Sequence, residues 1–372
     1  MKNYPAQNYL LSRMELHGDL HVVRQLQMFI QLQSDFAPGK TRLTPVDENQ
    51  LDVEQAPAAL TESVAGGLLR LGRQQFAFDL QRFISVRDGP NIRQSYDAAW
   101  ADYEIGTWRI ISFYSRPVQD RNERVFDDYS STKLTLSGFR VERQLNASTS
   151  LAAYFTHYTE AGSHYLTASG NERRGNFGVH MSGKSGTVDW NAETMTQLGQ
   201  VGPDGVFAWA VGALAGYSFQ KTPWKPRLGL QLDAASGNSN PHSHTLGSFN
   251  PMFPNGSYLT LAGYSGYVNF MQVKPSITLH PTSALKLMLA IAPQWRQTTA
   301  DAVYTQPDIA VAGTAGQPGT YTGTYGQIRL DWTICPSAAF AIEAVHFQVG
   351  NVIRRAGGHH GDYVGVQISY GL

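Results

Sequence analysis

The sequence predicts an all-β protein, a large transmembrane antiparallel β-barrel, on three observations. Its 372 residues are 42% hydrophobic and 16% charged, whereas about 25% charge is typical of soluble domains. Apolar and polar side chains alternate with a period of two over segments of roughly ten residues, long enough to cross hydrocarbon when tilted. Short and long connections alternate between these segments, as they do in outer-membrane barrels. We therefore expect one barrel domain over residues 1–372.

Composition excludes several other classes. The longest apolar stretch, about 207–215, is far shorter than the roughly 18–20 residues of a membrane-spanning helix. The single cysteine, Cys335, excludes a disulfide framework and a thiolate metal cluster. Lys plus Arg and Asp plus Glu are equal at 29 each, so net charge indicates no acidic partner.

The first strand shows the alternation most clearly. Met14, Leu16 and Leu20 fall on one face, while Glu15 and Asp19 fall on the other. The same pattern recurs at about 26–32, 228–233, 285–296, 327–332 and 364–370. Since successive side chains of a strand point to opposite faces, we expect the apolar rows to face lipid and the polar rows to line a wet, cationic lumen.

Alternation and turn residues together predict about seventeen strands. The predicted strands are 9–22, 25–35, 51–61, 66–76, 93–104, 107–118, 132–142, 148–158, 173–182, 187–198, 205–218, 224–236, 267–279, 283–296, 321–333, 338–349 and 363–371. Short connections are expected on the periplasmic side and long ones outside the cell. Aromatic residues near the strand ends are expected to form interfacial girdles; they are Trp100, Tyr103, Trp108, Tyr114, Tyr154, Tyr158, Trp209, Tyr217, Trp224, Trp295 and Trp332.

An odd number of strands is unusual in a bacterial barrel. The first predicted strand ends in a tight turn, so it runs toward the periplasm and requires an upward strand before it. Residues 1–8 are too short for that strand and lack the apolar core of a signal peptide. We expect that the sequence lacks its signal peptide and one N-terminal strand, which gives about eighteen strands in the complete protein.

One segment carries a resemblance to a known family. Leu-Arg-Leu-Gly-Arg-Gln-Gln at 69–75, Arg82 and Ser-Val-Arg-Asp-Gly-Pro-Asn-Ile-Arg-Gln-Ser-Tyr-Asp at 85–97 resemble the alginate-export family of Gram-negative outer-membrane proteins. Supporting stretches lie at 16–22, 51–56, 126–128 and 249–258. The resemblance implies an eighteen-stranded barrel whose arginine-rich lumen passes an anionic uronate polymer, although many similar proteins have an undetermined substrate.

A selective pore of this width needs a loop that folds inward, and residues 77–92 are the best candidate. Residues 66–95 contain five arginines and two aspartates, Asp79 and Asp88, so five minus two gives a net charge of +3. Guanidinium groups bind carboxylates through two parallel hydrogen bonds, and a positive field concentrates anions. With residues on predicted inward faces added, the predicted substrate-binding residues are Arg70, Arg73, Arg82, Arg87, Arg93, Asp97, Arg140, Arg227, Lys274, Arg296 and Arg329.

A structural explanation competes with this one. Acidic residues on predicted inward faces are equally numerous, so arginines and carboxylates of neighbouring strands could simply neutralise each other. Those acids are Glu15, Asp19, Asp97, Glu142, Asp189, Glu193, Asp233, Asp331 and Glu343. Asp97 is expected on the lumenal face, where it would orient Arg93 or Arg87.

The leading hypothesis is an outer-membrane channel for an anionic polysaccharide, and a general or small-solute porin is the alternative. An outer-membrane lipase or protease is disfavoured because no nucleophile motif is present, and an adhesive barrel with a plugged lumen remains a further alternative. Expected partners are outer-membrane lipid, anionic polysaccharide or small anionic solutes, with a periplasmic export scaffold as a further candidate. No cofactor, metal or nucleic acid is expected, since His242, His244, His359 and His360 fall in predicted external loops.

Overall fold

The computed structural model describes residues 6–62 and 66–371. Its main sheet has 19 strands, of which β7 (Tyr129–Ser130) and β14 (Thr245–Leu246) have two residues each. The other seventeen are long and correspond one to one with the predicted strands, so the all-β barrel class is confirmed. They are β1 (Ser12–Val23), β2 (Leu26–Phe36), β3 (Asn49–Glu62), β4 (Gly67–Gln74), β5 (Tyr96–Ile105), β6 (Trp108–Gln119), β8 (Leu134–Asn146), β9 (Thr149–His164), β10 (Ser169–Ser185), β11 (Val188–Val201), β12 (Asp204–Ser218), β13 (Arg227–Ala235), β15 (Phe270–Leu279), β16 (Leu285–Trp295), β19 (Tyr321–Cys335), β20 (Ala338–Val349) and β21 (Gly361–Tyr370).

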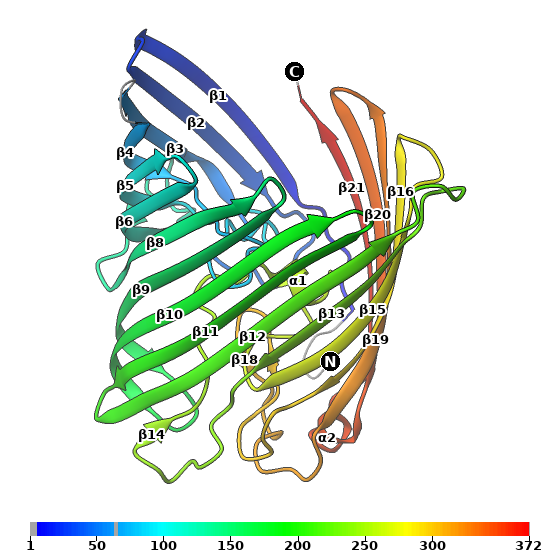
Figure 1. Cartoon of the computed structure of the whole chain (residues 1–372). Coiled ribbons are helices and arrows are strands. Elements are labelled where there is room, and N and C mark those ends of the chain that lie inside the picture. Colours follow the sequence, from blue (N-terminus) through cyan, green and yellow to red (C-terminus); the bar gives the residue numbers. More distant parts are fainter. Residues whose placement is uncertain (1–5, 63–65, 372) are drawn as a thin grey trace.

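Each long strand pairs antiparallel with the next long strand along the chain. The pairing continues in the same way through the second half of the chain. The sheet curls into a barrel with short turns at its upper end and long loops at its lower end (Figure 1). Among the described residues, no ladder joins β1 to β21, and the two strands stand apart in the view (Figure 1).

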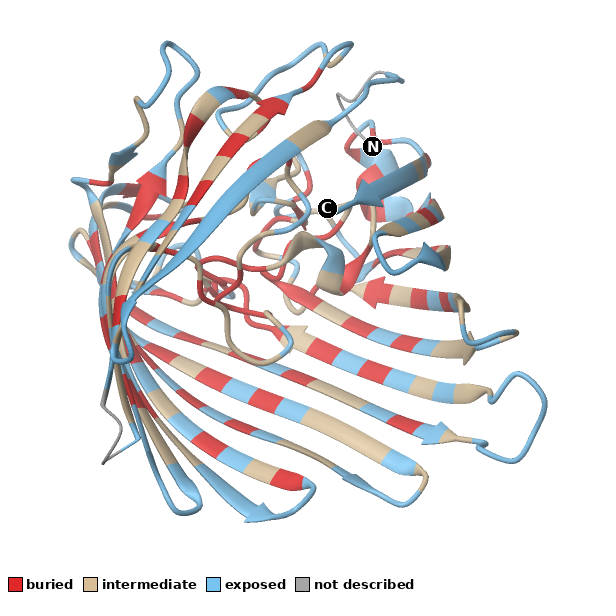
Figure 2. Cartoon of the chain, turned by 90° about the horizontal axis from the view of Figure 1, so that it is seen from above, coloured by how far each residue is buried: buried red, intermediate tan, exposed pale blue. Residues whose placement is uncertain are grey.

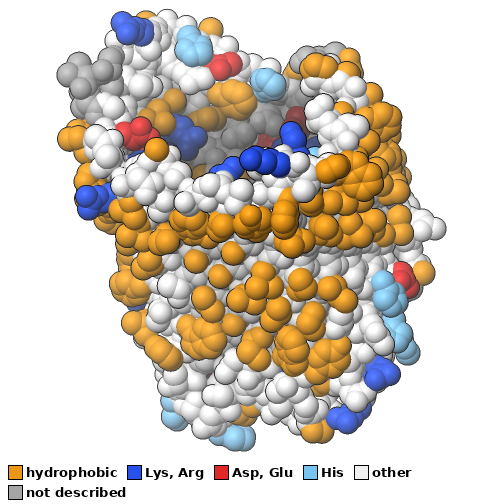
Figure 3. All heavy atoms as spheres, turned by 45° about the vertical axis from the view of Figure 1, so that its right-hand side comes forward, with side chains coloured by type: hydrophobic (Ala, Val, Ile, Leu, Met, Phe, Trp, Pro, Cys, Tyr) orange, Lys and Arg blue, Asp and Glu red, His pale blue; other side chains and the backbone are white. Residues whose placement is uncertain are grey.

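The outward face is apolar, as predicted. Leu16, Val364 and Ile368 are 70–75% exposed on the first and last strands, and orange apolar side chains cover the barrel wall below its upper rim (Figure 3). Alternate positions of these strands face the lumen. A lipid-facing belt of this kind is typical of outer-membrane barrels.

The lumen that we expected to be wet is partly filled by apolar side chains. Inward residues of β5 to β13 form an apolar core with two inward-folded loops, and this core includes Trp100, Leu136 and Met195. Trp100, Tyr154 and Tyr158, which we expected in interfacial girdles, contribute their side chains to this interior instead. Buried loop segments are visible inside the ring of strands (Figure 2). Packed side chains therefore fill part of the lumen near the long-loop end.

The long loops contain the remaining short elements. These are α1 (Gly256–Leu259), α2 (Asn351–Arg355), and the pair β17 (Tyr304–Thr305) and β18 (Ile309–Ala310). In α2, Val352 and Ile353 pack against inward residues of β19 and β20 such as Tyr325 and Phe347. No helix in the described residues is long and apolar enough to cross a membrane.

Candidate functional site

Residues 75–95, which connect β4 to β5, cross the lumen, and we call this segment the strap. At one end of the strap, Asn91 donates to the carbonyl oxygens of Ser12, Phe36 and Asp47, near β1 and β2. Toward its other end, Arg82 contacts Glu193 of β11. Eight long strands lie between β1 and β11 in the order of the barrel, so the segment that we expected to fold inward does so and spans the interior.

The first anchor of the strap is Asp79. Its carboxylate accepts two hydrogen bonds of 2.8 Å from Arg140 of β8 and lies 2.9 Å from Nδ1 of His180 on β10. Burial acts to raise the pKa of Asp79, but the bonds and charges of His180 and Arg140 hold it below its ordinary value. Asp79 has a φ of 53°, a conformation that L-residues rarely adopt, so these contacts maintain a strained backbone.

The second anchor is Arg82, which is 1% exposed. Its guanidinium donates to Asn191 at 2.8 Å, to Glu193 at 3.1 Å and to the hydroxyl of Tyr258 at 2.6 Å. Gly212 of β12 makes this position possible, because a Cβ there would lie 2.5 Å from Nε of Arg82. The guanidinium therefore holds the strap to the wall.

The third anchor lies on the opposite side of the lumen. Asp88 accepts hydrogen bonds from Arg93 at 2.7 Å and from Arg13 of β1 at 3.0 Å, and Arg93 also reaches Glu15 at 2.8 Å. Burial acts to raise the pKa of Asp88, but the hydrogen bonds and charges of Arg93 and Arg13 lower it below its ordinary value. Asp97 takes no part here, so its predicted pairing with Arg93 or Arg87 is wrong.

A second loop, residues 236–269 between β13 and β15, packs against the strap. Ile84 forms a parallel bridge with Phe253, and the ring of Phe83 lies 5.4 Å from Phe249 and 5.5 Å from Tyr267. Arg87 donates to the carbonyl oxygen of Met252 at 3.1 Å. The two loops thus share one apolar core.

Two further predicted cations hold loop backbone. Lys274 of β15 donates to the carbonyl oxygens of Tyr258 and Leu259 in α1. Arg296, which is fully buried, donates to carbonyl oxygens of residues 301–319 in the loop between β16 and β19, including Thr314 and Gly319. Both side chains stabilise loops that fill the long-loop half of the lumen.

On the short-turn side of the strap, cations and carboxylates alternate along the inner wall. Arg109 donates to Asp102, Arg227 to Asp189 and Arg329 to Glu343, and Lys286 lies 3.7 Å from Asp331. Three of these pairs join neighbouring strands, as expected for cross-strand charge pairs, whereas Arg227 of β13 reaches across β12 to Asp189 of β11. We call these residues the charge belt. A hollow mouth with Lys and Arg side chains along it opens at this end (Figure 3).

Arg70 differs from these cations. It lies opposite Trp100 on the lumenal face of β4 and β5, with its guanidinium carbon 5.3 Å from the indole ring centre. Within residues 6–62 and 66–371, no carboxylate lies within 4.0 Å of it, and neither its Nε nor the indole Nε1 of Trp100 has a hydrogen-bond acceptor. Arg70 is therefore a lumenal guanidinium that can accept an anionic ligand without first breaking an ion pair.

The comparisons with known proteins agree with this geometry. The sequence profile of the family described as "Alginate export" matches residues 1–367. The chain belongs to the alginate export family. This family and this fold are those of outer-membrane transport channels rather than enzymes, so the chain is an outer-membrane channel of a Gram-negative bacterium. No relative among the curated proteins matches it.

Solved structures similar to this alginate export family barrel are outer-membrane proteins of the same architecture. The outer membrane protein opdK from Pseudomonas aeruginosa is 12% identical with a TM-score of 0.59, and 97% of each chain is covered. OccD3 (OpdP) from Pseudomonas aeruginosa is 10% identical with a TM-score of 0.61, covering 99% of this chain and 87% of that one. Acinetobacter baumannii OccAB1 is 8% identical with a TM-score of 0.60, covering 98% and 95%. At these identities the likeness shows the fold alone.

Two predicted site residues, Arg73 and Asp97, alternate with the residues that face the lumen. Arg73 and Asp97 alternate with Gln74 and Tyr96, which are buried toward the lumen, so by strand alternation they start from the other face of the sheet. Their expected lumenal orientation is wrong. Arg73 donates to Asp97 at 3.1 Å, and the hydroxyl of Ser130 also donates to that carboxylate.

Sequence reasoning missed the partners that hold the strap. The sequence analysis counted Asp79 and Asp88 only in the net charge of residues 66–95, and it did not consider His180 or Asn191. The signal that could have found His180 and Asn191 is their position on inward faces of β10 and β11, where a polar side chain needs either water or a partner.

Proposed function

We propose that this outer-membrane channel passes an anionic polysaccharide, a uronate polymer of the alginate type. The observation that carries the proposal is membership of the alginate export family over residues 1–367. A polyuronate bears one carboxylate per sugar, and guanidinium groups bind carboxylates with two parallel hydrogen bonds. The charge belt offers arginines on three strands of the inner wall, β6, β13 and β19.

The arrangement of the belt suits transient binding. Each of its arginines is already oriented by a carboxylate, so a passing anion exchanges with or shares that partner rather than ordering a free side chain. Conduction needs sites that bind strongly enough to admit the solute and weakly enough to release it. Arg70, just on the short-turn side of the strap and without a carboxylate partner, would be the strongest anion site on this route.

The test is electrical. The protein is inserted into planar lipid bilayers, and ion selectivity is taken from the reversal potential in a salt gradient before and after addition of oligouronates. We expect anion selectivity and a concentration-dependent block of current by oligouronates. Cation selectivity together with indifference to oligouronates would contradict the proposal.

A variant of Arg70 sharpens this test. Replacing Arg70→Gln removes an unpaired cation, so we expect reduced anion preference and weaker oligouronate block. Arg173→Gln is the matched control, because Arg173 is an exposed arginine on the outward side of β10. Equal block in the wild type and the Arg70→Gln variant would remove Arg70 from the route.

A second candidate function is a porin for small anionic solutes. The observation that favours it is the shared apolar core of the strap and the 236–269 loop, which fills lumen that a polymer would otherwise occupy. In that case liposomes containing the protein would admit monomeric uronates, and oligouronates would neither pass nor block.

A further inference from the structure

A shallow groove of about 690 Å³ lies on the outer wall of the barrel, across β15, β16, β19, β20 and β21. Its apolar sides include Leu289, Ile291, Ile328 and Val364, and all four side chains are exposed. The groove therefore opens toward lipid and not toward the lumen. We call it the wall groove.

Two small residues form the floor of the wall groove. Gly326 pairs with Ile291 on one side and with His346 on the other, and Ala344 pairs with Val364. A Cβ added at Gly326 would meet no heavy atom within 4 Å, and the backbone there is not left-handed. Neither backbone conformation nor packing within the chain therefore requires glycine at this position. Glycine inside a strand often marks a place where a ligand approaches closely.

The wall groove is polar at the end that lies nearest the long loops. His346 and Asp362 pair across β20 and β21, with Nδ1 and Oδ1 2.7 Å apart, and both side chains are largely exposed. Histidine and acidic side chains are visible at the right-hand edge of the apolar wall, with Lys or Arg side chains below them (Figure 3). A charged side chain on the lipid face costs much at the bilayer centre and little near the interface. The pair therefore marks the level of the lipid headgroups.

A basic loop adjoins this polar end. Residues 350–360, which connect β20 to β21, contain two arginines and two histidines but no acidic residue. Arg354 and Arg355, at the end of α2, are exposed. The ring of His360 lies 6.1 Å from that of His346, so the loop borders the groove directly.

The two arginines of this loop are available to an anion. Arg354 donates to the side-chain oxygen of Asn351, and Arg355 donates to the carbonyl oxygen of Pro318 at 3.1 Å. Both acceptors are uncharged. In the part of the chain that the structure describes, no carboxylate lies within 4.0 Å of either guanidinium.

We propose that the wall groove binds a phosphorylated glycolipid of the outer leaflet, lipopolysaccharide. One acyl chain would lie over Gly326 and Ala344, and a phosphate would lie at Arg354 and Arg355. The long loops of outer-membrane barrels face the cell exterior, where the outer leaflet consists mainly of this glycolipid, and its lipid A part carries both acyl chains and phosphates. Guanidinium groups bind phosphate strongly, and basic clusters beside membrane-spanning segments bind anionic headgroups.

The charge of the loop favours this occupant over a second copy of the chain. A symmetric dimer across the groove would bring two identical basic loops together, and like charges repel. The proposal does not depend on what the channel transports, so failure of the transport hypothesis leaves it intact.

The test is native mass spectrometry of the full chain, released from detergent micelles after detergent exchange has removed bound lipid. With purified lipid A, we expect one tightly bound molecule per protein, and much weaker adducts with phosphatidylethanolamine at the same concentration. Equal adducts with both lipids would mean that hydrocarbon contact alone is responsible, which would overturn the proposal. Dimers without lipid A adducts would assign the groove to a second copy and would also overturn it.

The arginine variant tests the phosphate contact. Arg354→Gln combined with Arg355→Gln is expected to weaken lipid A binding about tenfold or more, because each basic residue near an anionic lipid surface contributes roughly a factor of five. Undiminished binding in this double variant would overturn the proposal.

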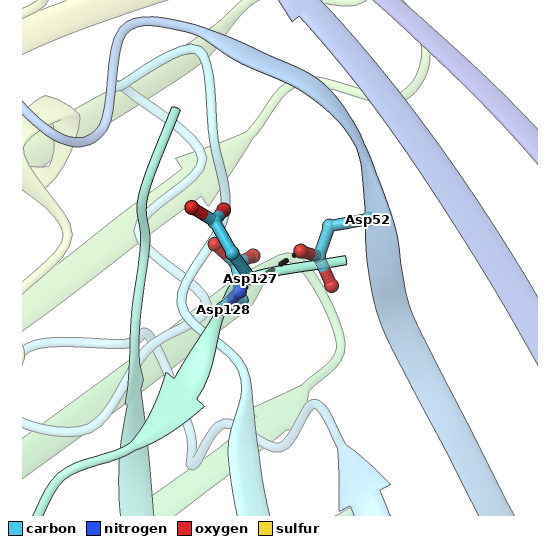
Figure 4. A group of neighbouring side chains, drawn as sticks. All are labelled: Asp52, Asp127 and Asp128. Atoms are coloured by element: carbon cyan, nitrogen blue, oxygen red, sulfur yellow. Dashed lines mark hydrogen bonds between the residues drawn. The ribbon is translucent and has the colours of Figure 1, made fainter. Parts of the chain in front are cut away.

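The loop between β6 and β8 supplies the matched control for this variant. Asp52 of β3 lies beside Asp127 and Asp128 of that loop (Figure 4), and each carboxylate accepts a backbone N–H. These bonds hold the loop without the side chains of Arg121 and Arg124, which are exposed. Arg121→Gln combined with Arg124→Gln should therefore bind lipid A like the wild type.

A second variant tests the acyl-chain contact. Gly326→Leu fills the floor of the groove without a clash, since no heavy atom lies within 4 Å of the added Cβ, and we expect weaker lipid A binding. Ala153→Leu, at an exposed position of β9, is the matched control and should leave binding unchanged. Undiminished binding in the Gly326→Leu variant would overturn the proposal.

Discussion

At the residue scale, the lumenal arginines are defined by their partners. Arg82 and Arg140, each at most 4% exposed, hold the strap through carboxylates, whereas Arg70 has none. Arg227 lies directly over Gly216, where a Cβ would come within 2.1 Å of its guanidinium carbon. The lumenal arginines of a barrel are therefore not one class, since some maintain the structure and others remain available to a solute.

The pair of Arg82 and Glu193 gives the first prediction at this scale. Arg82→Met leaves a buried carboxylate without its cation, and breaking such a pair typically costs about 3–5 kcal/mol. We expect faster hydrogen–deuterium exchange over residues 79–84. Arg121→Met, at an exposed loop position, should not change this exchange.

The double variant Arg82→Met with Glu193→Gln separates charge from packing. If the unpaired carboxylate is the cause, the second change should restore much of the protection. Equally fast exchange in the single and double variants would mean that lost packing is the cause instead.

Asp308 gives a prediction about pH. This residue lies in the loop between β16 and β19, its Oδ1 is buried without a donor, and burial raises its pKa from 3.8 to about 7. A carboxyl whose pKa is raised on folding destabilises the protein progressively as pH rises from the unfolded value through the folded value. Asp308→Asn should therefore raise the melting temperature more at about pH 8 than at about pH 4. The φ of 68° at this position is one that asparagine tolerates.

At the element scale, the strap is fixed at both ends by aspartates whose pKa values lie below the ordinary 3.8. A lowered carboxyl pKa stabilises the folded state above the unfolded value, and the contribution is lost as pH falls through the folded value. We expect single-channel conductance to be constant from about pH 5 to 8 and to rise below about pH 4 as Asp79 and Asp88 become protonated. A conductance that does not change between pH 5 and pH 3 would contradict this role of the two aspartates.

The seventeen long strands could be predicted because a strand's alternation is a local property. The strap contacts could not, because Asp79 lies 61 positions from Arg140 and Arg82 lies 111 from Glu193, and no local pattern connects them. One unused signal was the apolar run at 207–215. In the structure Phe207 and Val211 face outward while Ala208 and Ala210 are fully buried toward the lumen, so a strand that is apolar on both faces marks the place where a loop packs inside the barrel.

At the scale of the whole molecule, neighbouring residues of a strand need opposite polarity, because one faces lipid and the next faces the lumen. Val366 of β21 faces outward and is 61% exposed, whereas Gln367 faces inward. Val366→Arg is expected to reduce folding stability in lipid bilayers by about 2–4 kcal/mol, the cost of a lipid-facing arginine near the bilayer centre. Gln367→Arg should change it little, and denaturant titration in lipid vesicles measures both. Equal losses in the two variants would contradict the assignment of faces.

Because the strap and the 236–269 loop bury their aromatic side chains against each other, neither can leave its place without exposing the other's apolar surface to water. Because of this mutual dependence, we expect the two loops to move together in one step rather than separately. Current through one molecule should then switch between two discrete levels, and intermediate levels should rarely be occupied. Smoothly graded amplitudes would mean that each loop moves independently.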